Sequence, residues 1–308
     1  MPLSVPIIKV GRCLRDLLTG LALLNACYIL PCTRCAWLLD FVLCASSGPR
    51  EMTLPDTDII IFYDIYGNVP GSSWSPNTWK TRLALNYKGL PYRTEWVEYP
   101  ELTPLLASLG VPPSESAASP PYTLPAIYDP RTRKAIMDSY KIALYLDSTY
   151  PDTPALVRAE TRVFHAAFEH AFDMVLRRHL RPLVLHRAAA VLSPPSAKYF
   201  LETREKALGF KLEELSPPGS AKRVQDWAEV EKGFSVVASW FEAAGDGRLL
   251  LSGDGTLTHA DTHVAGCLMW LRLVFGPESE DWRRVEGLNG GFWKRYLAGF
   301  AKWMDTSR

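Results

Sequence analysis

The pattern of apolar residues in the first half of the chain predicts two strands with a helix between them. Residues 59–63 form a continuous β-branched and aromatic run with the length of a buried strand. Residues 91–99 alternate between polar and apolar types, as a half-buried strand does. Between these runs the apolar residues Trp79, Leu83 and Tyr87 recur every four positions, so they share one face of a helix.

This helix has a marked start and a marked end. Serine is a favoured N-cap and proline a favoured first helical residue, so the pair Ser75-Pro76 predicts the start. Gly89 is typical of a residue that stops a helix. The resulting strand, helix and strand place a helix N-terminus at one end of the unit.

The next segment predicts a loop followed by two strands and a second helix. Residues 100–121 are rich in proline and serine and lack periodicity, so we expect a loop with one short helical turn around 105–109. Strands are predicted at 122–128 and 134–137, and a helix follows from Asp138 to about Thr149.

Two dipeptides in this segment predict a binding cradle. A proline inside a strand-like run removes a ladder donor, so Leu124-Pro125 belongs at a sheet edge or in a special turn. A helix that opens on Asp138-Ser139 offers backbone N–H groups and short polar side chains to an anion. Together they indicate a peptide-sized cradle with a carboxylate-binding end.

The second half of the chain is helical in pattern. Pro151 and Pro154 mark a linker. Beyond it, amphipathic or apolar periodicity predicts helices over 155–179, 196–215, 227–244, 262–274 and 291–304. Thr258 and Asp261 have the spacing of a capping box, with aspartate in place of the usual glutamate or glutamine. We interpret that box as a folding signal.

Composition limits the partners of the protein. With 308 residues, of which 47% are hydrophobic, the chain is long enough for two domains with a substantial core. A net charge of +1 gives no electrostatic case for a nucleic-acid groove or an anionic membrane surface. We therefore expect a small-molecule partner or a second copy of the chain, with no nucleic acid and no stable membrane span.

Residues 1–52 differ from the rest as an apolar, cysteine-rich extension. The apolar run 17–30 is shorter than the roughly 20 residues that span a bilayer, and no clear cleavage site follows it, so its role in targeting stays open. The Cys32 and Cys35 pair lacks the context of a redox or zinc site. Beyond Met52 only Cys267 remains, which fits a reducing, cytoplasmic environment.

The order of predicted elements resembles a known family. Strand, helix, strand, loop, two strands and helix is the thioredoxin-like arrangement, and that fold carries a cis peptide at the proline before its third strand. Together with Ser75-Pro76, Leu124-Pro125, Asp138-Ser139 and the 258–261 box, this order resembles a cytosolic glutathione transferase from about residue 58 to residue 303. The resemblance implies an α/β, thioredoxin-like glutathione-binding domain over 53–151 and an all-helical acceptor-binding domain over 155–308.

The stretch from Ser75 to Pro100 is most similar to fungal etherase-like glutathione transferases, which are related to bacterial β-etherases. By this resemblance Ser75 is the residue that activates the thiol, and the Leu124 backbone pairs with the cysteinyl part of glutathione beside Pro125. Asp138 and Ser139 hold the γ-glutamyl end. The resemblance further implies a homodimer that uses glutathione as co-substrate, needs no metal, and conjugates it to, or cleaves with it, a hydrophobic electrophile or aryl ether.

Several alternatives remain open at this stage. Ser75 is also a common N-cap for backbone reasons alone, and Ser72 and Ser73 are the next candidates for the thiol contact. Trp74 is a candidate for lining an apolar acceptor pocket. Other functions of the same fold are a glutathione-dependent isomerase of the zeta type and a non-catalytic ligand-binding or regulatory protein.

One helical face carries a histidine and two acidic residues, His165, Glu169 and Asp173. We interpret them as a solvated or inter-subunit polar stripe rather than a metal site. His259 and His263, which flank the capping box, are expected to be packing or surface residues.

Overall fold

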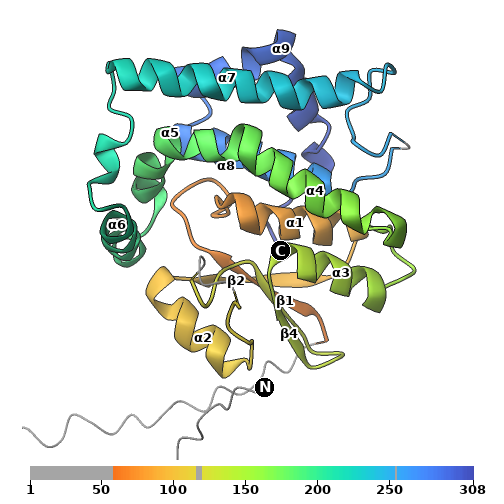
Figure 1. Cartoon of the computed structure of the whole chain (residues 1–308). Coiled ribbons are helices and arrows are strands. Elements are labelled where there is room, and N and C mark those ends of the chain that lie inside the picture. The colour runs from red at the N-terminus through yellow and green to blue at the C-terminus, as the bar shows by residue number, and fades with distance from the viewer. Residues whose placement is uncertain (1–57, 116–119, 254) are drawn as a thin grey trace, which may run out of the picture. The chain divides into compact units, whose positions relative to one another are not determined.

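The computed structural model describes residues 58–115, 120–253 and 255–308, all of which lie within the compact unit Thr53–Arg308. The predictions for residues 1–52, including the Cys32 and Cys35 pair, lie outside these residues. The described chain is an α/β domain followed by a helical domain, which confirms the predicted fold class (Figure 1). No helix in the described part of the chain combines the length and apolarity of a membrane span.

The first domain contains a mixed four-stranded sheet in the order β2-β1-β3-β4. Its strands are β1 (Ile60–Ile65), β2 (Tyr92–Val97), β3 (Ala126–Asp129) and β4 (Lys134–Met137). β1 pairs with β2 in parallel and with β3 in antiparallel orientation, and β3 pairs with β4 as an antiparallel hairpin. Its helices are α1 (Pro76–Lys88), α2 (Leu102–Ser108) and α3 (Ser139–Thr149). This is the predicted thioredoxin-like arrangement.

Both faces of β1 are covered, which explains its continuous apolar sequence. Successive strand residues point to opposite faces. Ile60 and Phe62 pack in one core with residues of α1 and α3, whereas Ile61 and Tyr63 belong to a second core that includes α2. A strand buried on both sides needs apolar residues at every position.

The proline-rich loop contains more helix than its sequence predicts. A single turn was expected around 105–109, but a 3₁₀ turn, Tyr99–Glu101, leads directly into the seven residues of α2. β3 begins only at Ala126, after a cis peptide bond between Leu124 and Pro125.

The second domain is built from long helices around α8. Its elements are α4 (Arg162–Phe172), a π-helical turn (Asp173–Arg177), α5 (Arg178–Ala188), α6 (Pro194–Leu208), α7 (Ala221–Glu242), α8 (His259–Phe275) and α9 (Glu280–Ala298). α4, the π turn and α5 follow one another without a break, and Figure 1 shows them passing over α1 and α8. Nearly every residue of α8 is buried, as its apolar sequence predicts.

The first helix of this domain starts later and ends later than the predicted 155–179. The carboxylate of Asp147 in α3 accepts the backbone N–H groups of Leu156 (3.0 Å) and Val157 (2.8 Å), which therefore stay outside the helix. At the other end the helix continues past His179 to Ala188, with Pro182 inside it. The linker is thus tied to the first domain.

The last helix, predicted over 291–304, corresponds to the second segment of α9 and the 3₁₀ turn Ala301–Trp303 that follows it. The first segment of α9 was not predicted: it begins at Glu280, where Ser279 accepts the N–H of Trp282 (3.1 Å) as an N-cap. Non-helical backbone from Leu288 to Gly291 then divides α9 into its two helical segments. Ser279 followed by two acidic residues was a start signal in the sequence that we did not use.

A close helix contact fixes the start of α1. A Cβ at Gly266 of α8 would lie 2.7 Å from the carbonyl oxygen of Pro76 and 3.4 Å from the Cβ of Trp79. Only glycine permits this approach, so the first turn of α1 is held against the centre of the helical domain.

Candidate functional site

The β3–β4 hairpin brings the two predicted cradle dipeptides together. Ala126, the first residue of β3, pairs with Met137, the last residue of β4. In an antiparallel pair, Pro125, which precedes Ala126, and Asp138, which follows Met137, must then be neighbours. Accordingly the N–H of Asp138 donates to the carbonyl oxygen of Pro125 at 3.2 Å.

The Leu124 backbone is available to a ligand. Leu124 precedes the first ladder pair of β3, and its backbone makes no hydrogen bond to another described residue. A buried backbone without partners is costly, since nearly all such groups in folded proteins are paired. A peptide lying along this segment would satisfy both its N–H and its C=O.

Asp138 has an unusual backbone conformation for a helix N-cap. Its φ of 87° is positive, a region that non-glycine residues rarely occupy. One carboxylate oxygen, Oδ1, accepts the N–H groups of Tyr140 and Lys141, both at 3.0 Å. Asp138 is exposed, and the hydroxyl of the neighbouring Ser139 makes no hydrogen bond within the described chain. The second oxygen, Oδ2, and this hydroxyl therefore remain for a ligand.

Ser75 is the N-cap residue of α1, but its side chain does not cap the helix. Its backbone is extended, its carbonyl accepts the N–H of Trp79 (3.0 Å), and its hydroxyl makes no hydrogen bond to any described residue. The N–H groups of Asn77 and Thr78 also donate to no described residue. At 9% exposure, Ser75 presents its hydroxyl beside two unused helix donors.

The neighbouring residues Ser73, Ser72 and Trp74 have different surroundings. Ser73 is fully buried and donates to Asp64 Oδ2 (2.7 Å), which also pairs with the buried Arg82 (2.9 Å). Ser72 is half-buried with φ of 59°. Trp74 is 3% exposed and lies against Gly67, so little of its ring faces outward.

A buried lysine on α1 is a residue that sequence reasoning missed. Lys80 is 5% exposed, and its ammonium group makes no hydrogen bond or ion pair with another described residue. Burial lowers its pKa to about 8, while the charges of Glu169 and Asp138 act in the opposite direction. The only signal of this burial in the sequence was that Lys80 follows Pro76 by four residues. This spacing places both residues on one face of α1, which in the structure packs against α8.

Two histidines of α8 lie next to this lysine. The Nε2 atoms of His259 and His263 are 3.2 Å apart, so one ring donates to the other. Burial lowers the pKa of both rings well below the usual value, and the positive charge of Lys80 adds to the effect. Both residues therefore pack as neutral rings, consistent with the packing role expected for them.

The predicted polar stripe runs from α4 into the π-helical turn, and its three residues contact separate partners. Asp173 pairs with Arg177 (2.7 Å) and Arg181 (3.2 Å), whereas Glu169 approaches His263 at 4.0 Å. His165 lies against the ring of His259 instead. Within residues 58–115, 120–253 and 255–308, no three His, Cys, Asp or Glu side chains are grouped to hold a metal ion.

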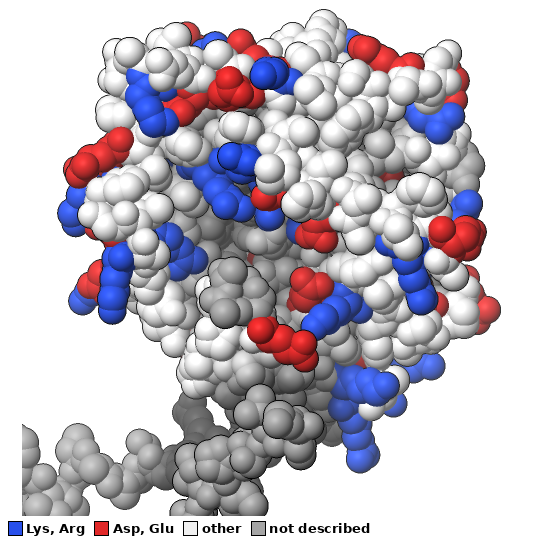
Figure 2. Space-filling view, in the orientation of Figure 1, with Lys and Arg blue, Asp and Glu red and all other residues white. Residues whose placement is uncertain are grey.

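The charged surface of the described chain is mixed. On the face shown in Figure 2, lysine and arginine side chains lie interspersed with aspartate and glutamate. The described chain also has ion pairs between residues four positions apart within a helix, Lys222 with Asp226 in α7 (2.5 Å) and Lys198 with Glu202 in α6 (4.0 Å). Such pairs contribute little to stability and create no large field of one sign.

A thioredoxin-like domain with a cradle at its cis-proline, followed by a helical domain, defines a class of glutathione-dependent proteins, and the family comparisons agree. The family described as glutathione S-transferase, N-terminal domain, matches residues 74–149, and glutathione S-transferase, C-terminal domain, matches residues 163–303. The glutathione S-transferase-like protein ustS of Aspergillus flavus is 31% identical over 273 residues, which cover 82% of this chain and 94% of that protein. The chain belongs to the glutathione S-transferase family.

Solved structures of fungal relatives share the fold. A glutathione S-transferase of Ceriporiopsis subvermispora, crystallised in complex with glutathione, is 45% identical with a TM-score of 0.77, over 80% of this chain and 98% of that one. A glutathione transferase of Phanerochaete chrysosporium is 44% identical with a TM-score of 0.74, with the same coverage. The expected resemblance to fungal glutathione transferases is confirmed.

Proposed function

We propose that this protein is a glutathione transferase that attacks a hydrophobic electrophile or an aryl ether with the glutathione thiolate. The observation that carries the proposal is the unused hydroxyl of Ser75 at the start of α1. A hydroxyl that served only the helix would bond to a backbone N–H of the first turn. The glutathione complex of the Ceriporiopsis subvermispora relative supports glutathione as the co-substrate.

The cradle is suited to the peptide part of glutathione. In the proposal, the Leu124 backbone next to Pro125 exchanges hydrogen bonds with the cysteinyl residue. Asp138 accepts the γ-glutamyl ammonium group through its open oxygen, and Ser139 with the α3 N-terminus binds the γ-glutamyl carboxylate. These contacts orient the sulfur toward the start of α1.

The Ser75 hydroxyl and the N-terminus of α1 together can stabilise the thiolate enough to lower the thiol pKa by about two units. A free thiol has a pKa of about 8.5. Lowering this pKa by about two units requires about 2.7 kcal/mol of stabilisation of the thiolate relative to the thiol. A hydrogen bond to a charged group contributes about 1.5 to 3 kcal/mol, and a helix N-terminus contributes about 0.3 to 1 kcal/mol. The open N–H groups of Asn77 and Thr78 belong to that helix end. Together they would keep most of the bound glutathione as thiolate at neutral pH.

No further protein group is then needed to form the carbon–sulfur bond. The thiolate forms a carbon–sulfur bond with the electrophilic carbon, and the leaving group, an aryloxide in an ether substrate, takes the departing electron pair. Water supplies the proton that the aryloxide needs. The acceptor specificity lies with the helical domain.

Two further expectations remain proposals. We propose a homodimer, as the family resemblance implies, which sedimentation velocity measures directly. We also propose a cytoplasmic location, because the chain beyond Met52 has the single cysteine Cys267 and so no internal disulfide. Burial raises the pKa of that thiol to about 12, which makes it unreactive.

The test is glutathione-dependent release of a fluorescent phenol from an aryl-ether probe by the purified full chain. The proposal predicts turnover that saturates with glutathione and is absent without it. Saturable binding of glutathione and probe without release of the phenol would contradict it and favour the ligand-binding alternative. Isomerisation of a maleyl probe at a higher kcat/KM than ether cleavage would favour the zeta-type alternative.

A further inference from the structure

The two buried lysines of α1 differ in whether the fold uses their charge. Lys88, which is 4% exposed, pairs with the Asp147 carboxylate at 2.7 Å and donates to the carbonyl oxygen of Pro154 at 2.9 Å. Lys80 is 5% exposed, and its ammonium group makes no hydrogen bond or ion pair with another described residue. A buried charge without a partner costs stability. The fold alone therefore gives no reason for a charge at Lys80.

The position of Lys80 on α1 directs its side chain toward the start of the helix. Ser75 and Lys80 are five residues apart, which is about 7.5 Å along the helix axis. The Cα–Cβ bond of a helical residue tilts toward the N-terminus, so the side chain of Lys80 sets out in the direction of Ser75. Its backbone is held against α8, because a Cβ at Gly266 would lie 3.6 Å from the Lys80 nitrogen. The base of the side chain thus lies next to the proposed thiol site.

Charged and titratable groups from four other segments lie within electrostatic range of the Lys80 ammonium group. They are Asp138 before α3, Glu169 of α4, Arg177 of the π-helical turn, and His259, His263 and Cys267 of α8. Asp138 belongs to the cradle, and the ring of His259 contacts that of Tyr140 in α3 at 5.4 Å between centroids. Because electrostatic interactions weaken with distance, these neighbours place the ammonium group between the start of α1, α8 and the cradle.

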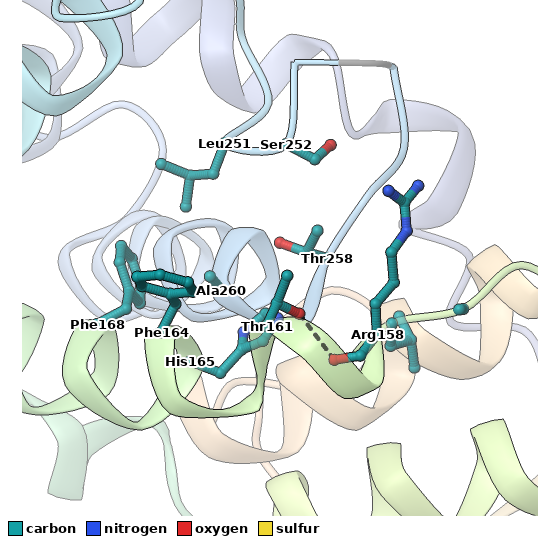
Figure 3. A pocket seen from close by; sticks show the side chains of 11 residues that line it. Arg158, Thr161, Phe164, His165, Phe168, Leu251, Ser252, Thr258 and Ala260 are labelled. Carbon is teal, nitrogen blue, oxygen red and sulfur yellow. Dashed lines mark hydrogen bonds between the residues drawn. The ribbon is translucent and has the colours of Figure 1, made fainter.

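None of these groups forms an ion pair with Lys80. Burial lowers the pKa of both α8 histidines well below the usual value and raises the pKa of Cys267 to about 12, so these side chains are no anions. Glu169 approaches His263 instead, at 4.0 Å. A cavity of about 290 Å³ at the start of α4 has His165 in its lining (Figure 3) but not Lys80. Lys80 is therefore a cation beside the cradle, and an anion that binds in the cradle would be its partner.

We propose that the Lys80 ammonium group stabilises the thiolate of bound glutathione through space, without contact to the sulfur. This inference rests on the proposed function. When glutathione binds, its thiol gives a proton to water, and the negative charge on the sulfur then lies in the field of Lys80. A nearby opposite charge favours the ionised form of a group, and salt screens buried charges little. The effect adds to that of the Ser75 hydroxyl and the α1 N-terminus. In return, the thiolate supplies the partner that Lys80 lacks in the free protein.

The experiment measures the pKa of the bound glutathione thiol, from thiolate absorbance in a pH titration, with the full chain as wild type, Lys80→Met and Lys80→Arg. We expect Lys80→Met to raise this pKa by about one unit, the lower end of the effect of a nearby opposite charge. Lys80→Arg keeps the positive charge, so the thiol pKa should stay within about 0.3 units of the wild-type value. The same thiol pKa in wild type and Lys80→Met would overturn the proposal.

Lys88→Met is the matched control, because it removes the other buried lysine of the same helix. Lys88 lies eight residues beyond Lys80, or about 12 Å along the axis. The variant leaves Asp147 without its lysine partner, so it should be less stable than wild type. At a temperature where it is folded, it should leave the thiol pKa unchanged. A shift of equal size in Lys88→Met and Lys80→Met would mean that the position of Lys80 is irrelevant and that the proposal is wrong.

A binding measurement identifies which part of glutathione responds to Lys80. Isothermal titration calorimetry at about pH 7.5 compares glutathione with S-methylglutathione, which has no thiol. A thiol pKa raised by about one unit should weaken glutathione binding to Lys80→Met about fivefold and leave S-methylglutathione binding unchanged. Equal weakening of both would make a carboxylate of glutathione the partner of Lys80 and overturn the proposal. If the thiol pKa shifts in Lys80→Met but wild type releases no phenol from the aryl-ether probe, this inference holds and the proposed function is wrong.

Discussion

The starts of α1 and α8 lie in neighbouring helices and both open on a hydroxyl residue, yet only one hydroxyl is used by its helix. Thr258 donates to Asp261 Oδ2 at 2.6 Å, and the same oxygen accepts the Thr258 N–H at 2.9 Å. The hydroxyl of Ser75, by contrast, bonds to no described residue. A satisfied cap indicates a structural role, whereas an unsatisfied hydroxyl at a helix N-terminus indicates a ligand.

The starts of the two helices also differ in whether their buried charged side chain has hydrogen-bond partners. The carboxylate of Asp261 is buried but accepts several hydrogen bonds, including the N–H of Leu251 at 2.8 Å. Lys80 is buried one turn into α1 without any such partner in the described chain. The polar groups at the start of α8 therefore have partners within the described chain, as in a folding motif. Those at the start of α1 lack such partners, as in a site that awaits a ligand.

The largest expected effect is that of Ser75→Ala on turnover. Loss of one hydrogen bond to the thiolate, about 1.5 to 3 kcal/mol, raises the thiol pKa by about one to two units, so we expect kcat/KM with the aryl-ether probe at neutral pH to fall about tenfold. The free energy of unfolding should change by less than about 0.5 kcal/mol, because no cap bond is lost. Thr258→Ala should show the reverse pattern. A Ser75→Ala variant with normal turnover and reduced stability would make Ser75 an ordinary cap.

Lys80→Met should stabilise the protein, most strongly at neutral pH. The folded pKa of about 8 lies below the ordinary 10.5, a gap equivalent to about 3 kcal/mol. The folded state binds fewer protons than the unfolded state between these values, so wild-type stability rises with pH from about 8 to 10.5. Urea unfolding should show a gain of about 3 kcal/mol for the variant at pH 7 that disappears near pH 10.5. A gain independent of pH would contradict the buried charge.

Asp261→Ala should lower the free energy of unfolding by about 2 kcal/mol, since it leaves the N–H groups of Thr258 and Leu251 without an acceptor. Turnover per folded molecule should be unchanged. The measurement is urea unfolding together with kcat/KM at a temperature where the variant is folded. A loss of kcat/KM equal to that of Ser75→Ala would remove the distinction between the two helix starts.

Ser73→Ala has the smallest expected effect. The change leaves Asp64 Oδ2 with Arg82 as its remaining partner, and we expect a loss of about 1.5 kcal/mol in unfolding free energy. Because the Ser73 hydroxyl is engaged by Asp64, kcat/KM should stay within about twofold of wild type. A fall as large as that of Ser75→Ala would assign the thiol contact to Ser73 instead.

Local signals predicted most of the first domain and the start of α8 in the second. The cradle dipeptides, the start and stop of α1 and the Thr258 capping box each depend on a few consecutive residues, and the structure contains the elements they define. The signals succeeded because caps, turns and strand interruptions are set by backbone geometry within a few positions.

Features set by distant contacts were not predicted. The late start of α4 depends on Asp147 of α3, and the burial of Lys80 depends on α8 packing closely through Gly266. Ser73 could not be separated from Ser75 in the sequence, because its partner Asp64 lies in β1. Neither periodicity nor capping rules describe contacts between segments far apart in sequence.

The most direct test of the central claim is the pKa of the glutathione thiol when bound to wild type and to Ser75→Ala, followed by thiolate absorbance in a pH titration. We predict a value about two units below that of free glutathione in wild type, and a rise of at least about one unit in the variant, as loss of a hydrogen bond to a thiolate requires. Thr258→Ala should retain the wild-type value. The same thiol pKa in wild type and Ser75→Ala would contradict the role proposed for Ser75.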